Sequence, residues 1–354
     1  MKLAILTFQF AHNYGALLQA YALRDYLVKL GNDVQITPYY PQWAQKEYAF
    51  SPLTTGLTMK KRIKLTIQYK KRKKLAHVFT QFQKRFLHLK DSFETVEELE
   101  KYLNQFDIVV FGSDQIWNNS ITGDTDAYYG AGISCSRVSY AASLGTKTLT
   151  SVQEKHIKKY LPCFRYISVR ETQSQLLLQQ YVDKDVCTVT DPVFLLDYTE
   201  WIKICKPVSI KDKFMLVYFL KDDMLLLNYA YEYAKQYGLK IYEVHPTLAK
   251  FHNGCIPLYD IGPCEFLWLI KNAECICTNS FHATSFSLIF KKKLLHIPNS
   301  ISPERTMTLL RYLGIDIKER IENEPLYDFS LYNYDELNSV INKSKDFLQK
   351  MNNL

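Results

Sequence analysis

Short apolar runs that each end at a polar turn alternate with helix-like stripes along most of the chain. The first run spans Lys2 to Phe8 and ends at a polar loop. Apolar residues then recur at positions 20, 23, 27 and 30, the spacing of one helix face, and Gly31 ends the stripe. Residues 34–37, Val-Gln-Ile-Thr, form a second predicted strand. A strand, a helix and a strand in about 35 residues predict a β-α-β unit and a parallel sheet.

The alternation occurs in two series along the chain. The first series has further strands expected at residues 107–111, 137–142, 166–169 and 186–190. Residues 196–212 contain Pro207 and have mixed polarity, so we expect a linker there. The second series has strands expected at residues 214–220, 240–244, 274–278 and 294–298, and a closing helix at 334–351.

Two series predict two domains, and a chain of 354 residues suits two domains of ordinary size. We expect an α/β fold with two Rossmann-like domains that face each other across a cleft. The expected N-terminal domain is 1–205 and the expected C-terminal domain is 206–354. The last helix is expected to pack back on the first domain.

Polar residues stand directly after the predicted strands of the first series: Asn13, Ser113, Asp114, Ser143 and Arg170. Because the carboxyl ends of parallel strands share one edge of a sheet, these residues together predict a polar cleft. Arg170 suits a carboxylate or a phosphate, since its guanidinium is always charged and binds such groups with two hydrogen bonds. Structural roles are the alternative: Arg170 pairs with Glu171 or Asp191, and Asn13 only caps the helix that follows it.

The turn with Ser280 and His282 is the main candidate in the second series. It follows an apolar run at 275–277 and opens a helix-like stripe at 281–290. Ser280 is a good N-cap residue, so His282 falls in the first helical turn, where free amides and the helix dipole suit an anion. The alternative is a histidine that packs in an ordinary strand-to-helix turn. No Gly-x-Gly-x-x-Gly pattern follows the first strand, so a dinucleotide is not indicated.

Positive charge is concentrated in one segment. Between Tyr48 and Lys90 there are twelve Lys or Arg residues and no Asp or Glu, while the rest of the chain has 32 basic and 36 acidic residues. We expect a basic helical insert at about residues 40–90, centred on 60–74, that forms a lid or flap. The insert is expected to contact an anionic membrane surface or a polyphosphate-bearing substrate. Alternatively, its charged residues form only a solvent-exposed helix face. No recognised nucleic-acid module accompanies the basic segment, so nucleic acid is not an expected partner.

Cysteine spacing and hydropathy bear on metal binding and location. The eight cysteines include no Cys-x-x-Cys pair, so a structural zinc site is not expected. No run approaches the ~18 apolar residues of a membrane span. The apolar start is too short for a signal peptide and lacks a small-residue cleavage site. The expected location is cytoplasmic, with peripheral contact at the inner membrane face.

Seven short motifs resemble, in their order, the polysaccharide pyruvyl transferase family over about residues 1–315. They are Asn13-Tyr14-Gly15-Ala16, Leu18-Gln19-Ala20-Tyr21-Ala22-Leu23, Gly112-Ser113-Asp114-Gln115-Ile116-Trp117-Asn118, Ser139-Tyr140-Ala141-Ala142-Ser143, Ser168-Val169-Arg170-Glu171, Asp191-Pro192-Val193-Phe194-Leu195-Leu196 and Thr278-Asn279-Ser280-Phe281-His282. The resemblance implies a glycosyltransferase-B-like fold. It also implies transfer of pyruvate from phosphoenolpyruvate to a saccharide as a ketal, in cell-surface polysaccharide biosynthesis. Phosphoenolpyruvate is then a co-substrate, and neither a cofactor nor a metal is expected.

The resemblance also implies site residues. Carried over by position, the donor is held by Arg170, Ser280, Phe281 and His282. Asn13 and Gly15 are expected beside them. Some relatives carry an arginine next to the histidine, and Gly often follows it, whereas this chain has Ser280, Phe281 and Ala283. Arg305 or Lys293 is expected to supply the missing charge.

Ketal formation needs one acid and two activated hydroxyl groups. Our hypothesis is that His282 is the acid, or donates to the phosphate oxygens, and that Asp114 and Asn13 orient or deprotonate the acceptor. Acceptor contacts are expected from Gln115, Trp117 and Ser143, with a polyprenyl-pyrophosphate-linked saccharide as the candidate acceptor.

Two other functions remain open. One is a nucleotide-sugar-dependent glycosyltransferase of the same fold, with Glu265 near the ribose. The other is a catalytically silent two-domain protein that binds a sugar or a phosphate.

Overall fold

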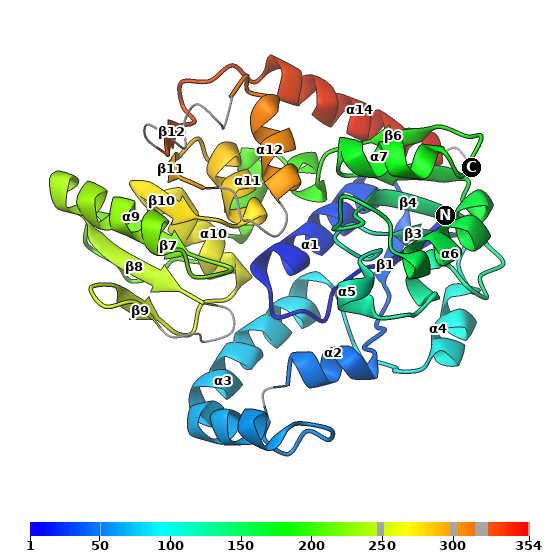
Figure 1. Ribbon diagram of the computed structural model, residues 1–354, viewed down its shortest axis with the longest axis horizontal. Coiled ribbons are helices and arrows are strands. Elements are labelled where there is room, and N and C mark those ends of the chain that lie inside the picture. The colour runs from blue at the N-terminus through cyan, green and yellow to red at the C-terminus, as the bar shows by residue number, and fades with distance from the viewer. Residues whose placement is uncertain (50, 246–250, 298–302, 316–324, 353–354) are drawn as a thin grey trace.

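The computed structural model describes the whole chain except residues 50, 246–250, 298–302, 316–324 and 353–354. Two separate six-stranded sheets, each flanked by helices, lie side by side (Figure 1). The prediction of an α/β fold with two Rossmann-like domains is therefore confirmed. In the part of the chain that is described, no helix is both long and apolar enough to cross a membrane.

The first sheet is parallel throughout and has the strand order β2-β1-β3-β4-β5-β6. Its strands are β1 (Lys2–Leu6), β2 (Asp33–Ile36), β3 (Ile108–Phe111), β4 (Ser136–Ala142), β5 (Tyr166–Val169) and β6 (Val186–Thr188). Leu6 pairs with Phe111, and Ala142 pairs with Val169, so these four central strands end at the same edge. Residues that follow the strands are thereby brought together, as the sequence predicts.

The second sheet has the order β9-β8-β7-β10-β11-β12, in which only β12 runs antiparallel. Its strands are β7 (Phe214–Tyr218), β8 (Lys240–Val244), β9 (Ile256–Leu258), β10 (Cys275–Thr278), β11 (Lys293–Leu295) and β12 (Leu326–Asp328). Apart from β12, this is the 3-2-1-4-5 order of a Rossmann sheet. The loop after β10 lies at the switch point of that order, and it carries Ser280 and His282.

Helices of the first domain cover both faces of its sheet. They are α1 (Tyr14–Lys29), α2 (Gln42–Glu47), α3 (Met59–Phe86), α4 (Val96–Leu103), α5 (Asn119–Thr122), α6 (Ser151–Tyr160) and α7 (Thr172–Gln179). The basic insert thus consists of a short helix, α2, and a long helix, α3. Asn13 begins α1 because its side-chain oxygen accepts from the amides of Gly15 and Ala16, at 2.9 and 3.2 Å.

The expected linker at 196–212 contains a helix, α8 (Tyr198–Ile204). Asp197 and Glu200 form a capping box at its start, and Trp201 is fully buried against Phe286 of the second domain, with ring centroids 4.9 Å apart. The prediction of a linker is therefore wrong for residues 198–204, because a capped and packed helix occupies them.

The second domain has α9 (Met224–Tyr237), α10 (Pro263–Asn272), α11 (Phe281–Ile289) and α12 (Pro303–Arg311), and the chain closes with α14 (Asp335–Met351). Helix α14 lies along the first domain (Figure 1). Ser344 accepts from the Thr190 amide at 2.9 Å, and Phe347 contacts the rings of Tyr140 and Tyr166. The last helix thus packs against the first sheet rather than the second.

Candidate active site

The carboxylate of Asp191 lies between Arg170, which follows β5, and His282, in the first turn of α11. Asp191 Oδ2 is 2.9 Å from Arg170 Nη2 and 3.4 Å from His282 Nε2. All three residues are buried, with exposed fractions of 1, 5 and 8% for Asp191, Arg170 and His282. Arg170 therefore does pair with Asp191, as the structural alternative predicts, but this ion pair uses only Nη2 of the guanidinium group.

Asp191 is held in its charged form. Burial alone would raise its pKa, but Arg170, His282 and the Val193 amide outweigh burial and lower the pKa to about 2. The Val193 amide donates to Oδ1 at 3.0 Å, which also fixes the turn after β6. The sequence suggested Asp191 only as a structural partner, and its position facing a histidine from the other domain was not foreseen.

Several buried guanidinium donors in this region have no hydrogen-bond partner among the described residues: Nε and Nη1 of Arg170 and Nε of Arg305. Buried N–H groups are rarely left without a partner, so they indicate a place for a bound acceptor. Arg170 and Arg305 both face the ring of Phe281, with guanidinium carbons 5.2 and 5.6 Å from its centroid.

Arg305 brings a second guanidinium group to the site. Burial lowers its pKa, and the neighbouring Arg170 lowers it further, whereas Asp114, Glu171 and Asp191 act in the opposite direction. An anion bound between the two guanidinium groups would offset the effect of Arg170 on Arg305 and stabilise the charged form of Arg305. Arg305, predicted as one possible source of the missing charge, therefore lies with Arg170 and Phe281.

Gly15 allows α1 to approach His282. A Cβ atom at this position would lie 2.0 Å from His282 Nδ1, well inside van der Waals contact. The start of α1 in the first domain thus touches the start of α11 in the second. Asn13 caps α1 through its side chain, which is the structural role given above as the alternative to ligand binding.

Asp114 lies in the turn after β3 with a positive φ of 80°. Its Oδ1 accepts from the Gln115 amide at 2.8 Å, and its main-chain oxygen accepts from the Ser143 amide at 3.0 Å. The carboxylate helps raise the pKa of Tyr48, after the larger effect of burial, and it also acts on Arg305. Asp114 therefore both stabilises its own turn and faces the cationic side of the site.

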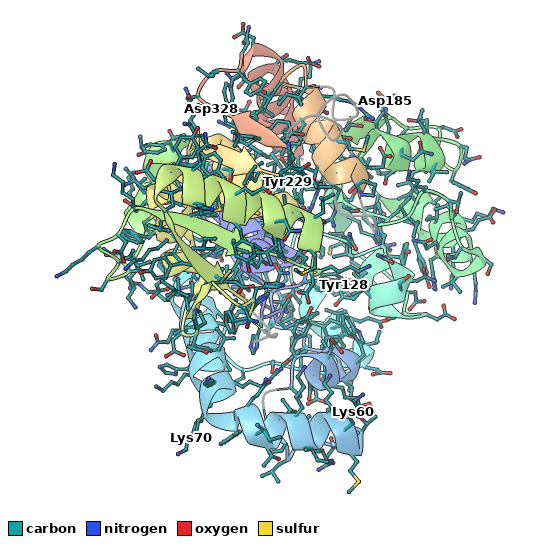
Figure 2. The ribbon with its side chains drawn as sticks, turned by 60° about the vertical axis from the view of Figure 1, so that its left-hand side comes forward. Lys60, Lys70, Tyr128, Asp185, Tyr229 and Asp328 are labelled. Atoms are coloured by element: carbon teal, nitrogen blue, oxygen red, sulfur yellow. The ribbon has the colours of Figure 1, made fainter. Side chains whose placement is uncertain are left out.

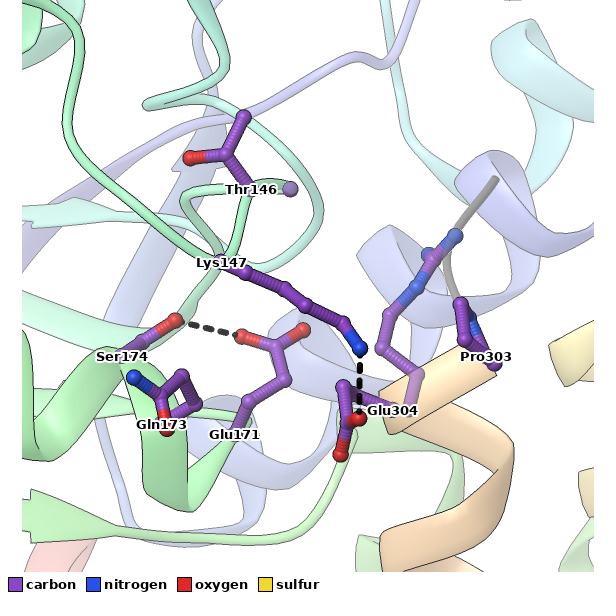
Figure 3. Close-up of a pocket in the computed structure, with 9 residues that line it drawn as sticks. Thr146, Lys147, Glu171, Gln173, Ser174, Pro303 and Glu304 are labelled. Carbon is purple, nitrogen blue, oxygen red and sulfur yellow. Dashed lines mark hydrogen bonds and ion pairs between the residues drawn. The ribbon is translucent and has the colours of Figure 1, made fainter. Parts of the chain in front are cut away.

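Ser143 and Glu171 form a second polar group at the same edge. Ser143 Oγ donates to Glu171 Oε1 at 2.8 Å, and Ser174 Oγ donates to Oε2 at 3.0 Å. Glu171 borders a pocket of about 60 Å³ between the domains (Figure 3). The pocket is lined by Gly145, Thr146, Lys147, Glu171, Gln173, Ser174, Pro303, Glu304 and Arg305. Lys147 and Glu304 pair across it at 3.3 Å.

Three predicted site residues do not join this group. Trp117 is fully buried in the first-domain core, where its Nε1 donates to the Tyr128 carbonyl at 3.0 Å. Lys293 is exposed and pairs in register with Cys275, at the end of the sheet opposite Ser280. Gln115 uses its side-chain oxygen to accept from Asn118 at 2.9 Å. The predictions for Trp117 and Lys293 fail because core packing and strand register place them away from the cleft edge.

Ser280 has the predicted capping role, since its Oγ accepts from the Ala283 amide at 3.4 Å. Glu265, the residue expected near a ribose in the glycosyltransferase alternative, forms an ion pair with Lys206 at 2.7 Å. Its carboxylate is therefore already engaged at the start of α10.

A separate cluster lies at the carboxyl end of β8. The buried Glu243 accepts from His245 Nε2 at 2.8 Å and from His252 Nδ1 at 2.6 Å, both through Oε1. Its Oε2 accepts from the His252 amide at 2.8 Å. These are the only described residues grouped as metal ligands would be, and their hydrogen bonds already satisfy the carboxylate. The expectation of an enzyme without a metal stays a prediction.

Solved structures of similar fold cover nearly the whole chain at low identity. UDP-GlcNAc 2-epimerase from Neisseria meningitidis, bound to UDP-GlcNAc, is 10% identical, with a TM-score of 0.51 over 99% of this chain and all of that one. The epimerase from Methanocaldococcus jannaschii is 13% identical, with a TM-score of 0.48 over 97% of this chain and 99% of that one. A glycosyltransferase from Streptomyces sp. SF2575 is 12% identical, with a TM-score of 0.47 over both whole chains.

The similarity to the Neisseria epimerase supports the glycosyltransferase-B-like arrangement of the two domains. No curated protein matches the chain. The sequence profile of one family, described as polysaccharide pyruvyl transferase, matches residues 13–301. That range includes Gly15, Asp114, Arg170, Asp191 and His282. It covers most of the chain, and the chain therefore belongs to the polysaccharide pyruvyl transferase family.

Proposed function

We propose that the protein transfers pyruvate from phosphoenolpyruvate to two hydroxyl groups of a saccharide, as a cyclic ketal. The observation that carries this proposal is the set of buried, unpaired guanidinium donors on Arg170 and Arg305 around the Phe281 ring, with His282 next to Arg170 across the Asp191 carboxylate. Phosphoenolpyruvate carries a carboxylate and a phosphate, and guanidinium groups bind both in a bidentate manner. Family membership gives the reaction class, and the donor set suits this doubly anionic substrate.

The chemistry requires an acid at the enol carbon. In the proposed mechanism His282 gives a proton to the terminal carbon of phosphoenolpyruvate, and the first sugar hydroxyl bonds to the central carbon and loses its proton. A second hydroxyl then bonds to the same carbon and loses its proton, and phosphate leaves with the C–O bond electrons, which completes the ketal. The Asp191 carboxylate faces Nε2 of His282 at 3.4 Å and positions both this ring and Arg170.

The remaining polar residues lie on the first-domain side. Asp114 is the candidate base for the acceptor hydroxyls, because its carboxylate lies in the turn after β3 and faces Arg305. Glu171 lines the small pocket between the domains, and Ser143 donates to its carboxylate, so both are candidates for acceptor contacts. The acceptor that we propose is a cell-surface saccharide carried on a polyprenyl pyrophosphate at the inner face of the membrane.

Donor binding and turnover test the proposal separately. Phosphoenolpyruvate alone should raise the thermal unfolding temperature of the wild type, and this rise should be lost in Arg170→Ala. With a panel of candidate saccharides, the wild type should release phosphate and add one pyruvate ketal to the acceptor, as seen by mass spectrometry. His282→Gln should still bind the donor but release phosphate at least a hundredfold more slowly. Turnover of the His282 variant at the wild-type rate would exclude the acid role.

A nucleotide-sugar-dependent glycosyltransferase is the alternative that the fold favours, since the Neisseria epimerase is bound to UDP-GlcNAc. The ion pair of Glu265 with Lys206 argues against a free ribose-binding carboxylate at this position. Thermal stabilisation by nucleotide sugars, without stabilisation by phosphoenolpyruvate, would favour this alternative. A silent binding protein would be stabilised by a ligand but would release no phosphate.

A further inference from the structure

The long helix α3 has two halves with different surroundings. In the C-terminal half, Leu75, Phe79 and Phe82 are buried and pack in the core that the two domains share. In the N-terminal half, from Met59 to Tyr69, only Leu65 is buried. This half lies away from both sheets, near the labelled Lys60 and Lys70 (Figure 2). The core therefore fixes one end of the helix and leaves the other end exposed.

The exposed half carries an apolar stripe. Met59, Ile63 and Ile67 follow one another at intervals of four residues, so they lie on one face of the helix, and their exposed fractions are 80, 55 and 80%. Leu53, at 84%, lies in the loop before the helix. Arg62 holds that loop to the helix by donating to the carbonyls of Pro52 and Thr54, at 3.1 and 3.4 Å. Exposed large apolar side chains that gather in this way usually mark an interaction site.

Every charged residue in this half of α3 is positive, although Glu47 of α2 pairs with Lys61 at 3.4 Å. Lys60 and Lys64 are exposed in this half and Lys70 is exposed directly after it, and no acidic residue occurs between Tyr48 and Lys90. An apolar face with a lysine-rich border is the pattern of a helix that lies in the interface of an anionic bilayer. A second copy of the chain would bring like charges together, and nucleic acid would leave the apolar stripe without a partner.

We infer that the face formed by Leu53, Met59, Ile63 and Ile67, with lysines at 60, 64 and 70, docks the protein on an anionic membrane surface. This surface is called the docking face below. The inference does not depend on pyruvyl transfer. It assigns the membrane contact to a smaller part of the basic insert than residues 60–74, because Lys71 and Lys74 contact the second domain instead.

Lys71 and Lys74 face the second domain of the protein. Lys71 Nζ lies 4.0 Å from the centre of the Tyr259 ring, and Lys74 Nζ lies 4.0 Å from Asp260 Oδ2. These contacts join α3 to the loop before α10. Charge changes at Lys71 or Lys74 would therefore disturb the domain contact as well as any membrane contact, and they are unsuitable as tests of docking.

The test is sedimentation of the whole protein with vesicles of phosphatidylcholine alone or mixed with phosphatidylglycerol. The wild type should bind only the anionic vesicles, and added salt should weaken the binding. Ile63→Ser with Ile67→Ser should lower the partition coefficient at least tenfold. Lys60→Glu with Lys64→Glu should also lower it, by about fivefold or more for each lysine. Matched controls are Leu176→Ser with Leu331→Ser, at positions exposed by 64 and 81%, and Lys211→Glu with Lys235→Glu, which should bind as the wild type does.

A second measurement separates insertion from surface attraction. Tryptophan in Ile67→Trp should be quenched by vesicles with brominated acyl chains, because the docking face lies in the headgroup boundary. Unchanged binding of the two serine variants, or no binding of the wild type to anionic vesicles at low salt, would overturn the inference. So would a concentration-dependent dimer in solution that the serine variants abolish. Pyruvyl transfer to a water-soluble acceptor should be the same in the wild type and the serine variants.

Discussion

The Asp191 carboxylate brings together an arginine and a histidine from different domains. Arg170 comes from the end of β5, and His282 from the start of α11, which is more than a hundred residues later in the chain. A buried charge is tolerated only where opposite charges and hydrogen bonds compensate its loss of hydration. Asp191 therefore stabilises the closed arrangement of the two domains and also positions the groups that we propose to bind the donor.

Asp191→Asn tests this double role. The wild-type carboxylate has a pKa of about 2, below the 3.8 of an ordinary Asp, so the unfolded chain binds the extra proton first as the pH falls. The stabilisation is fully present above pH ~4 and is lost as the pH falls through ~2. It amounts to about 2 kcal/mol from the pKa difference alone. In the variant, the neighbouring Arg170 loses its buried partner, and we expect the free energy of unfolding at pH 7 to fall by about 3 kcal/mol.

The measurement is urea unfolding of both proteins from pH 7 to pH 2.5. The wild type should lose stability more steeply than Asp191→Asn below pH 4, so that the two free energies approach each other. Parallel curves over this range would contradict the assignment of a depressed pKa to Asp191. Asp185→Asn is a suitable control for the same chemical change at a residue that lies near the surface of the first domain (Figure 2).

Contact between the starts of two helices defines the site at the scale of secondary structure. Helix α1 approaches α11 closely enough that Gly15 leaves no room for a side chain beside His282. We expect Gly15→Ala to displace the imidazole and to lower kcat at least tenfold, since small misplacements of a reacting group have large effects. The fold should remain intact, because alanine suits a helix better than glycine does.

Steady-state phosphate release measures this effect, with Gly31→Ala as the matched control. Gly31 has a φ of +88° and no neighbouring atom within 4 Å of an added Cβ, so alanine there strains the backbone without touching the site. The control should lower stability by about 1 kcal/mol and leave kcat unchanged. Equal turnover in Gly15→Ala and the wild type would show that the position of His282 does not limit the reaction.

The same elements show what sequence patterns could predict. Buried strands with polar turns after them are regular, so periodicity predicts the two sheets, the strand ends with Asp114 and Arg170 in the first sheet, and the turn with His282 in the second. Strand β9 contains Pro257 and strand β12 joins the sheet antiparallel, so neither fits the pattern of apolar runs that alternate with helices, and neither is predicted. Helix α8 was hidden by the mixed polarity of its segment. The positions of Trp117 and Lys293 depend on packing and register, which neighbouring residues along the chain do not encode.

At the scale of the whole molecule, one hydrophobic core runs through both domains and the basic insert. Tyr14 of α1 stacks on Phe266 of α10, with ring centroids 4.2 Å apart, and on Phe79 of α3 at 5.3 Å. Its hydroxyl donates to the Ile261 carbonyl at 3.1 Å. All three rings are buried. Tyr14, which precedes Gly15, thus joins the first domain to the second domain and to the C-terminal half of α3.

Because of this shared core, we expect the wild type to unfold in a single cooperative transition by calorimetry. Tyr14→Ala removes a buried ring that packs against all three parts. It should lower the free energy of unfolding by about 4 kcal/mol and split the calorimetric transition into one for each domain. It should also abolish stabilisation by phosphoenolpyruvate, since Arg170 and His282 come from opposite domains. Phe164→Ala is the control, because Phe164 is equally buried but lies within the core of the first domain. It should lower stability by a similar amount while the transition stays single, and an indistinguishable result for Tyr14→Ala would mean that the domains are coupled elsewhere.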